Sequence, residues 1–275
     1  MNLLKFIESF TDEKFLNSTG DRRKSLGQFG TIGKGLALAT VPFGLSALSN
    51  KAFANDITPP PSTAIGALQL ALTLEYLEKE FYNMALDSGV IPASENGGRD
   101  LKVFQQIAQH ENDHVDFLIA GLGSANFVPK PTFDFTVGGA FDPFGNYQEF
   151  LALAQAFEDT GVRAYKGQAG NLIGSPDLLT AALQIHSVEA RHASEVRRLR
   201  GLKGWISGNI RGAGMPPETQ PVYDGEEVTT QAGFNTASVS NGSAGPTIPA
   251  IAGSEAYDEP ITTQKAVDIA NIFIV

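Results

Sequence analysis

Residues 111–114 read Glu-Asn-Asp-His and residues 189–192 read Glu-Ala-Arg-His, so the pattern Glu-x-x-His occurs twice in this chain. On a helix, positions i and i+3 lie on one face about a turn apart. Each tetrapeptide can therefore direct a carboxylate and an imidazole at one point. A single Glu-x-x-His is common on charged helix surfaces, whereas two in partner helices indicate a shared site.

Two further glutamates occur in apolar surroundings, and each is followed seven residues later by a tyrosine: Glu75 by Tyr82 and Glu158 by Tyr165. An unpaired charge on or beside an apolar helix face is costly, and a bound metal ion would remove that cost. We interpret the two tyrosines as hydrogen-bond or electron donors to the same site, with core packing as the alternative.

Helical periodicity recurs in four stretches that are separated by turn and capping residues. Pro59-Pro60-Pro61 precedes the first stretch, and Ser175-Pro176-Asp177 is a start signal for the fourth. Asp100 is the expected cap of the second stretch, and Gly121 or Gly123 is its expected stop. The prediction is four helices, at about 63–87, 101–122, 147–166 and 176–200.

The connection from Gly123 to Asn146 is too apolar to be a free linker. A segment of this length with aromatic anchors can run the length of a helical bundle while packing on it. Hairpin, long crossover and hairpin together predict an all-α four-helix bundle with a single long crossover. The expected anchors are Phe127, Phe133, Phe135, Phe141 and Phe144.

The chain divides by composition into residues 1–54, 55–201 and 202–275. Residues 1–54 contain Arg22-Arg23, sixteen uncharged residues from 35 to 50, and an Ala-Phe-Ala site at 52–54. This order partly resembles a bacterial twin-arginine export signal, and the uncharged stretch is too short to span a bilayer comfortably. We therefore expect a periplasmic or cell-envelope protein without an integral membrane span. The alternative is a retained N-terminal arm on a cytoplasmic protein.

The C-terminal region, residues 202–275, is rich in Gly, Ser, Thr, Pro and Asn and is expected to be extended and mostly irregular. A short hairpin is expected within 228–239 and a final helix at 262–272. We expect this region to wrap on the bundle or on a neighbouring subunit, which makes a homo-oligomer the expected assembly. The alternative is a flexible tail.

Charge and cysteine content restrict the chemistry of any site. The chain has a net charge of -10 and no cysteine, and residues 55–201 contain ten Lys and Arg against eighteen Asp and Glu. The absence of cysteine excludes disulfide scaffolds, thiolate metal sites and cysteine nucleophiles. The acidic balance argues against a nucleic-acid partner, because phosphate binding depends on Lys and Arg. Any metal must therefore bind through oxygen and nitrogen.

The order Glu, Glu-x-x-His, Glu, Glu-x-x-His resembles the ferritin-like superfamily, and more narrowly the bacterial ferritin-like proteins grouped with desiccation-related proteins. The resemblance covers about residues 63–200 and, more loosely, residues 254–260. It implies a dinuclear metal site with terminal carboxylates, bridging carboxylates and imidazole ligands. These are, respectively, Glu75 and Glu158, Glu111 and Glu189, and His114 and His192.

Three neighbouring residues keep alternative interpretations open. Glu78 is a rival ligand to Glu75, three residues away, with a solvated position as the alternative. His110 and His186 could support the ligands through hydrogen bonds, although a histidine hydrogen-bonded between helices is the simpler interpretation. Asp113 is expected at the surface, as is Asp116.

The resemblance implies two iron ions that react with O2 or peroxide and oxidise Fe(II) or a small reductant, so these are the expected partners. Manganese is the alternative metal, with peroxide dismutation as its reaction. A different hypothesis is a structural or stress-protective envelope protein that uses the bundle as an assembly scaffold. Iron storage in a cage has the least support, because no feature of the sequence specifies a cage. Whether the chain is an enzyme stays open at this point.

Overall fold

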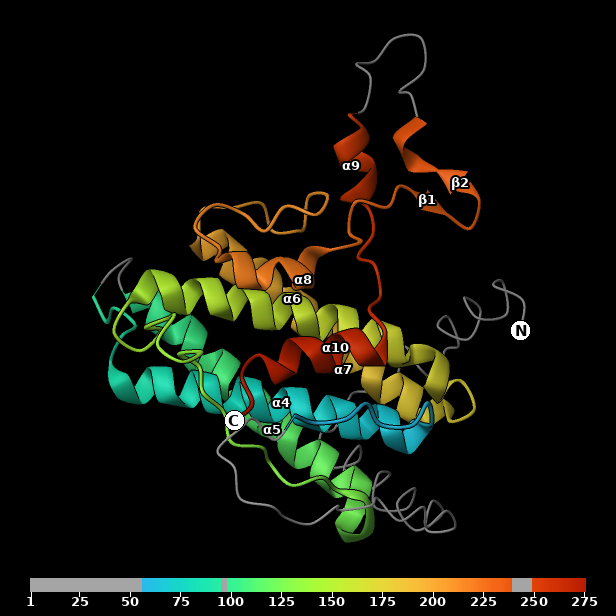
Figure 1. Ribbon diagram of the computed structural model, residues 1–275, viewed down its shortest axis with the longest axis horizontal. Coiled ribbons are helices and arrows are strands. Elements are labelled where there is room, and N and C mark those ends of the chain that lie inside the picture. Colours follow the sequence, from blue (N-terminus) through green and yellow to red (C-terminus); the bar gives the residue numbers. More distant parts are fainter. Residues whose placement is uncertain (1–55, 95–97, 239–248) are drawn as a thin grey trace, which may run out of the picture.

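The computed structural model describes residues 56–94, 98–238 and 249–275. The predicted export segment, residues 1–54, lies outside the described residues. Four long helices form a bundle, and the segment between the second and third is a single long crossover (Figure 1). The predicted all-α four-helix bundle is therefore confirmed. Its helices are α4 (Ala64–Ser88), α5 (Arg99–Asn126), α6 (Tyr147–Leu172) and α7 (Pro176–Leu199).

Two of the four helix starts follow the predicted signals, after Pro59-Pro60-Pro61 and at Ser175-Pro176-Asp177. The Thr63 side chain caps α4 by accepting a hydrogen bond from the Gly66 backbone N–H at 3.0 Å. Pro176 occupies the first turn of α7 after Ser175. The Asn146 side chain caps α6, which continues to Leu172 and is therefore longer than expected.

The prediction for the start of the second helix was wrong. Gly98, in the left-handed conformation with φ 74°, precedes α5, and no side chain caps this end. Asp100 instead lies within the helix and accepts a hydrogen bond from the Tyr147 hydroxyl at 2.8 Å. At the other end Gly123 leaves helical geometry (φ 65°, ψ 172°), as a stop there predicts, but helical hydrogen bonding resumes and α5 ends only at Asn126.

The helices pack as two hairpins. Helix α4 lies along α5 and α6 lies along α7, and the hairpins meet mainly between α4 and α6, whereas α5 and α7 touch at few residues. An aromatic cluster fills one part of the core: the Phe81 ring stacks on Phe150 with centroids 5.1 Å apart, and Phe104 meets Phe150 edge to face at 4.7 Å. Among the four pairs of adjacent helices in the bundle, α5 and α7 are the least closely packed.

The crossover packs on the bundle as predicted, although not through all five phenylalanines. Phe133, Phe135 and Phe141 are buried in the core, Phe144 is half-buried, and Phe127 is 47% exposed. The buried rings follow the Pro129 to Pro131 stretch, so the aromatic anchors lie along the middle and end of the crossover.

The C-terminal region combines short elements with irregular chain. The last helix, α10 (Thr263–Asn271), is capped by Thr262 and packs on α6 and α4 (Figure 1). Phe273 and Ile274 after it are buried, and Ile274 pairs with Phe133 of the crossover. The remaining elements are η2 (Pro217–Thr219), α8 (Gln220–Tyr223), β1 (Thr230–Gln231), β2 (Phe234–Asn235), η3 (Thr236–Ser238) and α9 (Ala250–Ser254).

The final helix was thus predicted correctly, and the hairpin within 228–239 is present as the small antiparallel pair of β1 and β2. These strands and α9 project away from the bundle in Figure 1. Within the described residues, no helix is apolar over a length sufficient to cross a bilayer.

Candidate metal centre

The six residues singled out in the sequence come together inside the bundle. Glu75 lies on α4, the first Glu-x-x-His on α5, Glu158 on α6, and the second Glu-x-x-His on α7. Their ligand atoms fall into two groups, each within 4.8 Å of one another: Glu75, Glu111, His114 and Glu189; and Glu111, Glu158, Glu189 and His192. The two groups share Glu111 and Glu189.

Each histidine directs its Nδ1 atom at three carboxylates. His114 Nδ1 lies 3.2 Å from Glu75 Oε2, 2.9 Å from Glu111 Oε2 and 3.1 Å from Glu189 Oε1. His192 Nδ1 lies 2.9 Å from Glu111 Oε1, 3.3 Å from Glu158 Oε2 and 3.6 Å from Glu189 Oε2. Glu111 and Glu189 therefore each present one oxygen to His114 and the other to His192.

The two tyrosines hold the unshared carboxylates in a reciprocal way. The Tyr82 hydroxyl on α4 donates to Glu158 Oε1 on α6 at 2.5 Å, and the Tyr165 hydroxyl on α6 donates to Glu75 Oε1 on α4 at 2.5 Å. Both tyrosines are buried, and burial raises their pKa values well above the ordinary one. Each hydroxyl therefore stays protonated and fixes one oxygen of its carboxylate, which leaves the other oxygen facing the cluster.

Burial of the carboxylates is nearly complete and shifts their protonation. All four glutamates of the two groups are 0% exposed. Burial raises the pKa of Glu75 to about 8, although the His114 charge opposes the shift. Burial also raises the pKa of Glu158 well above its usual value, against the opposing charge of His192. Each of these two carboxyl groups therefore loses its proton more readily when a positive charge lies nearby.

The pKa values of the shared Glu189 and of the two imidazoles are shifted in the directions that ion pairing produces. Burial raises the pKa of Glu189, but hydrogen bonds and charges from His114 and His192 outweigh it and hold this pKa below its usual range. Burial lowers the pKa of each imidazole, and the surrounding carboxylates outweigh it, so both imidazole pKa values are raised. The site thus stabilises positive charge at two positions.

Several atoms at the centre lack a hydrogen-bond partner in suitable geometry. Among the described residues these include Glu111 Oε1, Glu158 Oε2, both carboxylate oxygens of Glu189, and His192 Nδ1. Unsatisfied buried polar atoms are rare and costly. Here they are oxygen and imidazole nitrogen atoms that converge, the donor set that iron and manganese accept. The residues present therefore fit a dinuclear metal site.

Glu78 is buried beside this cluster but outside both ligand groups. Its side chain is 3% exposed, which excludes the solvated position considered from the sequence. Burial raises its pKa well above the usual value, and the charges of Glu189 and Glu158 raise it further. A side chain at Gly161 would meet Glu78 Oε1 at 3.2 Å, so the glycine makes room for this carboxyl group.

His110 supports His192 from outside the cluster. Its Nδ1 lies 2.9 Å from His192 Nε2, the two rings are stacked with an interplanar angle of 13°, and its Nε2 lies 2.8 Å from the Gln106 amide nitrogen. Because His192 uses Nδ1 toward the carboxylates, the contact with His110 orients its ring. His186 is half-buried on α7, and burial and the Lys166 charge lower its pKa.

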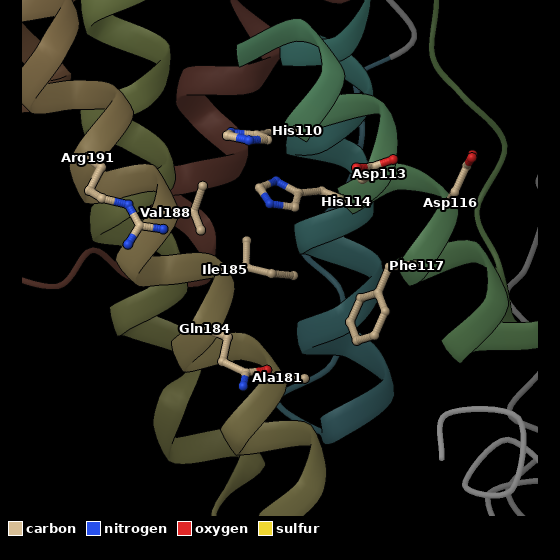
Figure 2. Close-up of a pocket in the computed structure, with 10 residues that line it drawn as sticks. All are labelled: His110, Asp113, His114, Asp116, Phe117, Ala181, Gln184, Ile185, Val188 and Arg191. Carbon is tan, nitrogen blue, oxygen red and sulfur yellow. The ribbon is translucent and has the colours of Figure 1, made fainter. Parts of the chain in front are cut away.

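A cavity of about 480 Å³ lies next to the cluster, between α5 and α7 (Figure 2). His114 belongs to both its wall and the ligand groups. This cavity was not predicted from the sequence, because its size depends on how closely α5 and α7 approach each other. The expectation that Asp113 and Asp116 lie at the surface is confirmed, since both are exposed.

Residues 63–202, half of the chain, match the model of the ferritin-like domain family. This range begins at the cap of α4 and ends just after α7, so it spans the bundle and all six residues of the two ligand groups. No curated protein matches the chain closely enough to count as a relative.

Proposed function

We propose that this chain, which belongs to the ferritin-like domain family, binds two metal ions in the buried cluster and uses them in oxidation chemistry. One metal would be held by Glu75 and His114, the other by Glu158 and His192. Glu111 and Glu189 would bridge the pair. Iron is the metal we favour, with manganese as the alternative, because carboxylate and imidazole ligands suit both.

The observation that carries the proposal is the division of the shared carboxylates. Glu111 and Glu189 each present one oxygen to the His114 side and one to the His192 side, at 2.9–3.6 Å from the imidazole nitrogens. A structural ion-pair network has no need for this division. Two cations placed side by side require it, because each must share the same two carboxylates.

The residues of the chain prepare the site for these ions. Tyr82 and Tyr165 keep the unshared carboxylates aimed inward, so little reorganisation is needed when a metal binds. Complete burial of the four glutamates excludes water and strengthens each electrostatic contact. Glu75 must lose its proton to ligate, which couples metal uptake to proton release.

When bound, a pair of redox-active metal ions would supply electron transfer to O2 or peroxide. The substrate oxidised in return would be Fe(II) or a small organic reductant. If manganese is the resident metal, dismutation of peroxide is the corresponding reaction. In each case the protein contributes a dry pocket, fixed carboxylates and imidazoles, and a limited number of routes to the cluster.

Metal stoichiometry of the full chain tests the proposal. The protein is loaded anaerobically with Fe(II), desalted, and measured by inductively coupled plasma mass spectrometry, and O2 consumption is then followed. We expect about two iron ions per chain and almost none in Glu189→Ala, which removes a shared carboxylate. Glu75→Ala removes a ligand from one group only and should retain about one ion.

Asp116→Ala is the matched control, because this acid lies on α5 but is exposed. Its iron content should equal that of the unaltered protein. Unaltered protein that is folded and assembled yet binds no metal would overturn the metal site and favour the scaffold hypothesis. Two bound ions without O2 or peroxide turnover would support the metal site and contradict the proposed oxidation chemistry.

A location in the periplasm or cell envelope, and a link to desiccation-related proteins, also remain proposals. The Arg22-Arg23 pair, the uncharged stretch and the Ala-Phe-Ala site support export. N-terminal sequencing of protein recovered from fractionated cells tests it. A mature chain beginning near Asn55 in the periplasmic fraction is expected, and an intact cytoplasmic chain would contradict export.

A further inference from the structure

The pocket between α5 and α7 is built entirely from these two helices (Figure 2). On the α5 side, the rings of His110, His114 and Phe117 face it, and on the α7 side Ile185 and Val188 face it. It forms where the two helices touch at few residues. Its volume of about 480 Å³ falls within the range of about 300–1,000 Å³ typical of small-molecule sites.

The pocket lies where the metal cluster comes nearest to solvent. The glutamate side chains of both ligand groups are 0% exposed and His192 is 6% exposed, whereas the His114 side chain is 12% exposed. His114 is also the one member of the cluster in the pocket wall. A molecule in this pocket would therefore contact the outer side of an imidazole whose Nδ1 faces the cluster.

The wall has the character of an aromatic-binding site. Phe117 and the two imidazoles offer ring faces and edges, and Ile185 and Val188 supply an aliphatic surface opposite them. Planar rings gain both buried apolar area and favourable edge or face contacts in such surroundings. Both nitrogens of His110 already contact His192 and Gln106, and His114 Nδ1 faces the carboxylates. His114 Nε2 is therefore the imidazole nitrogen that a hydroxyl on the bound molecule would meet.

Charge at the rim selects neither sign strongly. Asp113 and Asp116 lie on the α5 side and Arg191 lies on the α7 side, and all three are exposed. Charges on opposite rims partly cancel across the opening and are screened by solvent. A polyanion such as a nucleotide would find a single arginine. A metal ion would need a narrow polar path rather than a wide cavity with apolar walls.

We propose that the pocket between α5 and α7 binds a small uncharged aromatic molecule carrying a hydroxyl group, of the phenol or hydroquinone class, against His114. Its role as the organic reductant of the cluster rests on the proposed function, whereas its binding does not. The inference names the substrate class that the bundle accepts and the side from which it approaches.

The binding experiment uses 4-fluorophenol as the probe and the full chain as purified. Fluorine NMR line width and chemical shift report its affinity, and 4-fluorobenzoate, of similar size but anionic, is the charge control. We expect saturable binding of 4-fluorophenol. We expect at least tenfold weaker binding of 4-fluorobenzoate, not because of the rim charges but because its carboxylate would lose hydration against the apolar wall of Ile185 and Val188.

Two variants fill the pocket from α7, and one leaves it open. Val188→Trp and Ala181→Phe place a larger side chain in the cavity at different points, so that one remains informative if the other fails to fold. Ser187→Trp is the matched control, because Ser187 is exposed on the same helix outside the pocket. We expect at least a tenfold loss of 4-fluorophenol affinity in the first two and no change in the control.

Metal content, measured in parallel, separates the two proposals. Probe binding that the filling variants abolish, in protein that binds no metal, would support the pocket and overturn the metal site. Metal-loaded protein that does not bind the probe, or binds it equally in Val188→Trp and Ala181→Phe, would overturn the pocket assignment. Slower Fe(II) uptake in the filling variants without probe binding would identify an ion path instead, and altered subunit association without probe binding would identify a protein interface.

Discussion

The two sides of the bundle differ in how closely they are covered: the α4 and α6 side is closely packed, whereas the α5 and α7 side contains a cavity. On the α4 and α6 side, α10 packs on both helices, and with Phe273 it leaves a cavity of only about 10 Å³ beside Glu78, the carboxyl group next to the cluster. On the α5 and α7 side, a cavity of about 480 Å³ ends at His114. The C-terminal region thus covers the bundle on the side of α4 and α6, the closed side. On the other side, the open side, the few contacts between α5 and α7 leave an approach to the cluster. Selective access, rather than burial alone, distinguishes this site.

The largest effect is expected from replacing Arg163, the buried cation that links α6 to the C-terminal region. Arg163 on α6 is 1% exposed, pairs with Glu226 at 2.6 Å, and donates to the carbonyl oxygens of Val222, Asp224 and Glu259. Arg163→Met leaves a buried carboxylate without its cation, so we expect unfolding to become easier by about 5 kcal/mol in urea titrations.

Adding Glu226→Gln to Arg163→Met tests the reason for that loss. The double variant contains no unpaired buried charge, so we expect it to recover part of the lost stability. If the double variant is no more stable than Arg163→Met, the cost comes from the lost carbonyl hydrogen bonds and not from Glu226.

Phe273 provides the apolar part of the closed side. Its ring meets Phe157 edge to face at 4.8 Å, and the side chain is 4% exposed. Phe273→Ala should lower the free energy of unfolding by about 4 kcal/mol, because it removes buried area and leaves a cavity next to Glu78. Differential scanning calorimetry measures this effect.

Phe117→Ala is the corresponding change on the open side. Phe117 is half-buried in the pocket wall, so its removal should cost about 1 kcal/mol or less. Equal losses in the two variants would mean that the sides are equally packed in solution, contrary to the comparison.

His110, on the α5 and α7 side, is expected to affect metal affinity without being a ligand. Because it contacts Nε2 of His192, His110→Ala should weaken metal binding about 10–100-fold without removing a ligand. Competition with a chelator measures the affinity. Gln109→Ala, an exposed neighbour on α5, should bind metal like the unaltered protein, and an unchanged affinity in His110→Ala would remove its positioning role.

The smallest expected effect is a pH dependence whose sign depends on metal. The raised pKa of Glu75, about 8 in the fold against 4.5 ordinarily, contributes stability that is present below pH 4.5 and lost as the pH rises to 8. The raised pKa values of Glu158, His114 and His192 act in the same direction. The lowered pKa of Glu189 adds no slope between pH 5 and 8, because its stabilisation is already complete above pH 4.5. Metal-free protein should therefore show a Tm that falls by a few degrees between pH 5 and 8.

Metal-loaded protein should show the opposite slope, because bound cations favour the ionised carboxylates. Calorimetry across this pH range with and without metal checks both signs. In Glu75→Gln the residue cannot ionise, so the slope of the metal-free protein should become smaller. Identical slopes with and without metal would contradict a site at these carboxylates.

Local patterns predicted much of the bundle because its signals are short-range. Apolar periodicity, the Pro59-Pro60-Pro61 stretch and the Ser175-Pro176-Asp177 start signal depend on neighbours within a turn or two. The Asp100 cap was mispredicted because Gly98 supplied a left-handed turn and Tyr147, distant in sequence, took the aspartate as its acceptor. Helix ends that depend on tertiary partners are not readable from such patterns.

The sequence by itself determined the fold class and the six residues of the cluster, because a carboxylate on each apolar stripe and two Glu-x-x-His motifs leave few arrangements in a four-helix bundle. Only the tertiary structure decided that Glu78 is buried, that His110 contacts His192, and that α10 covers one side while the α5 and α7 seam stays open. These features depend on how helices rotate and how closely they approach, which residue spacing along one helix does not specify.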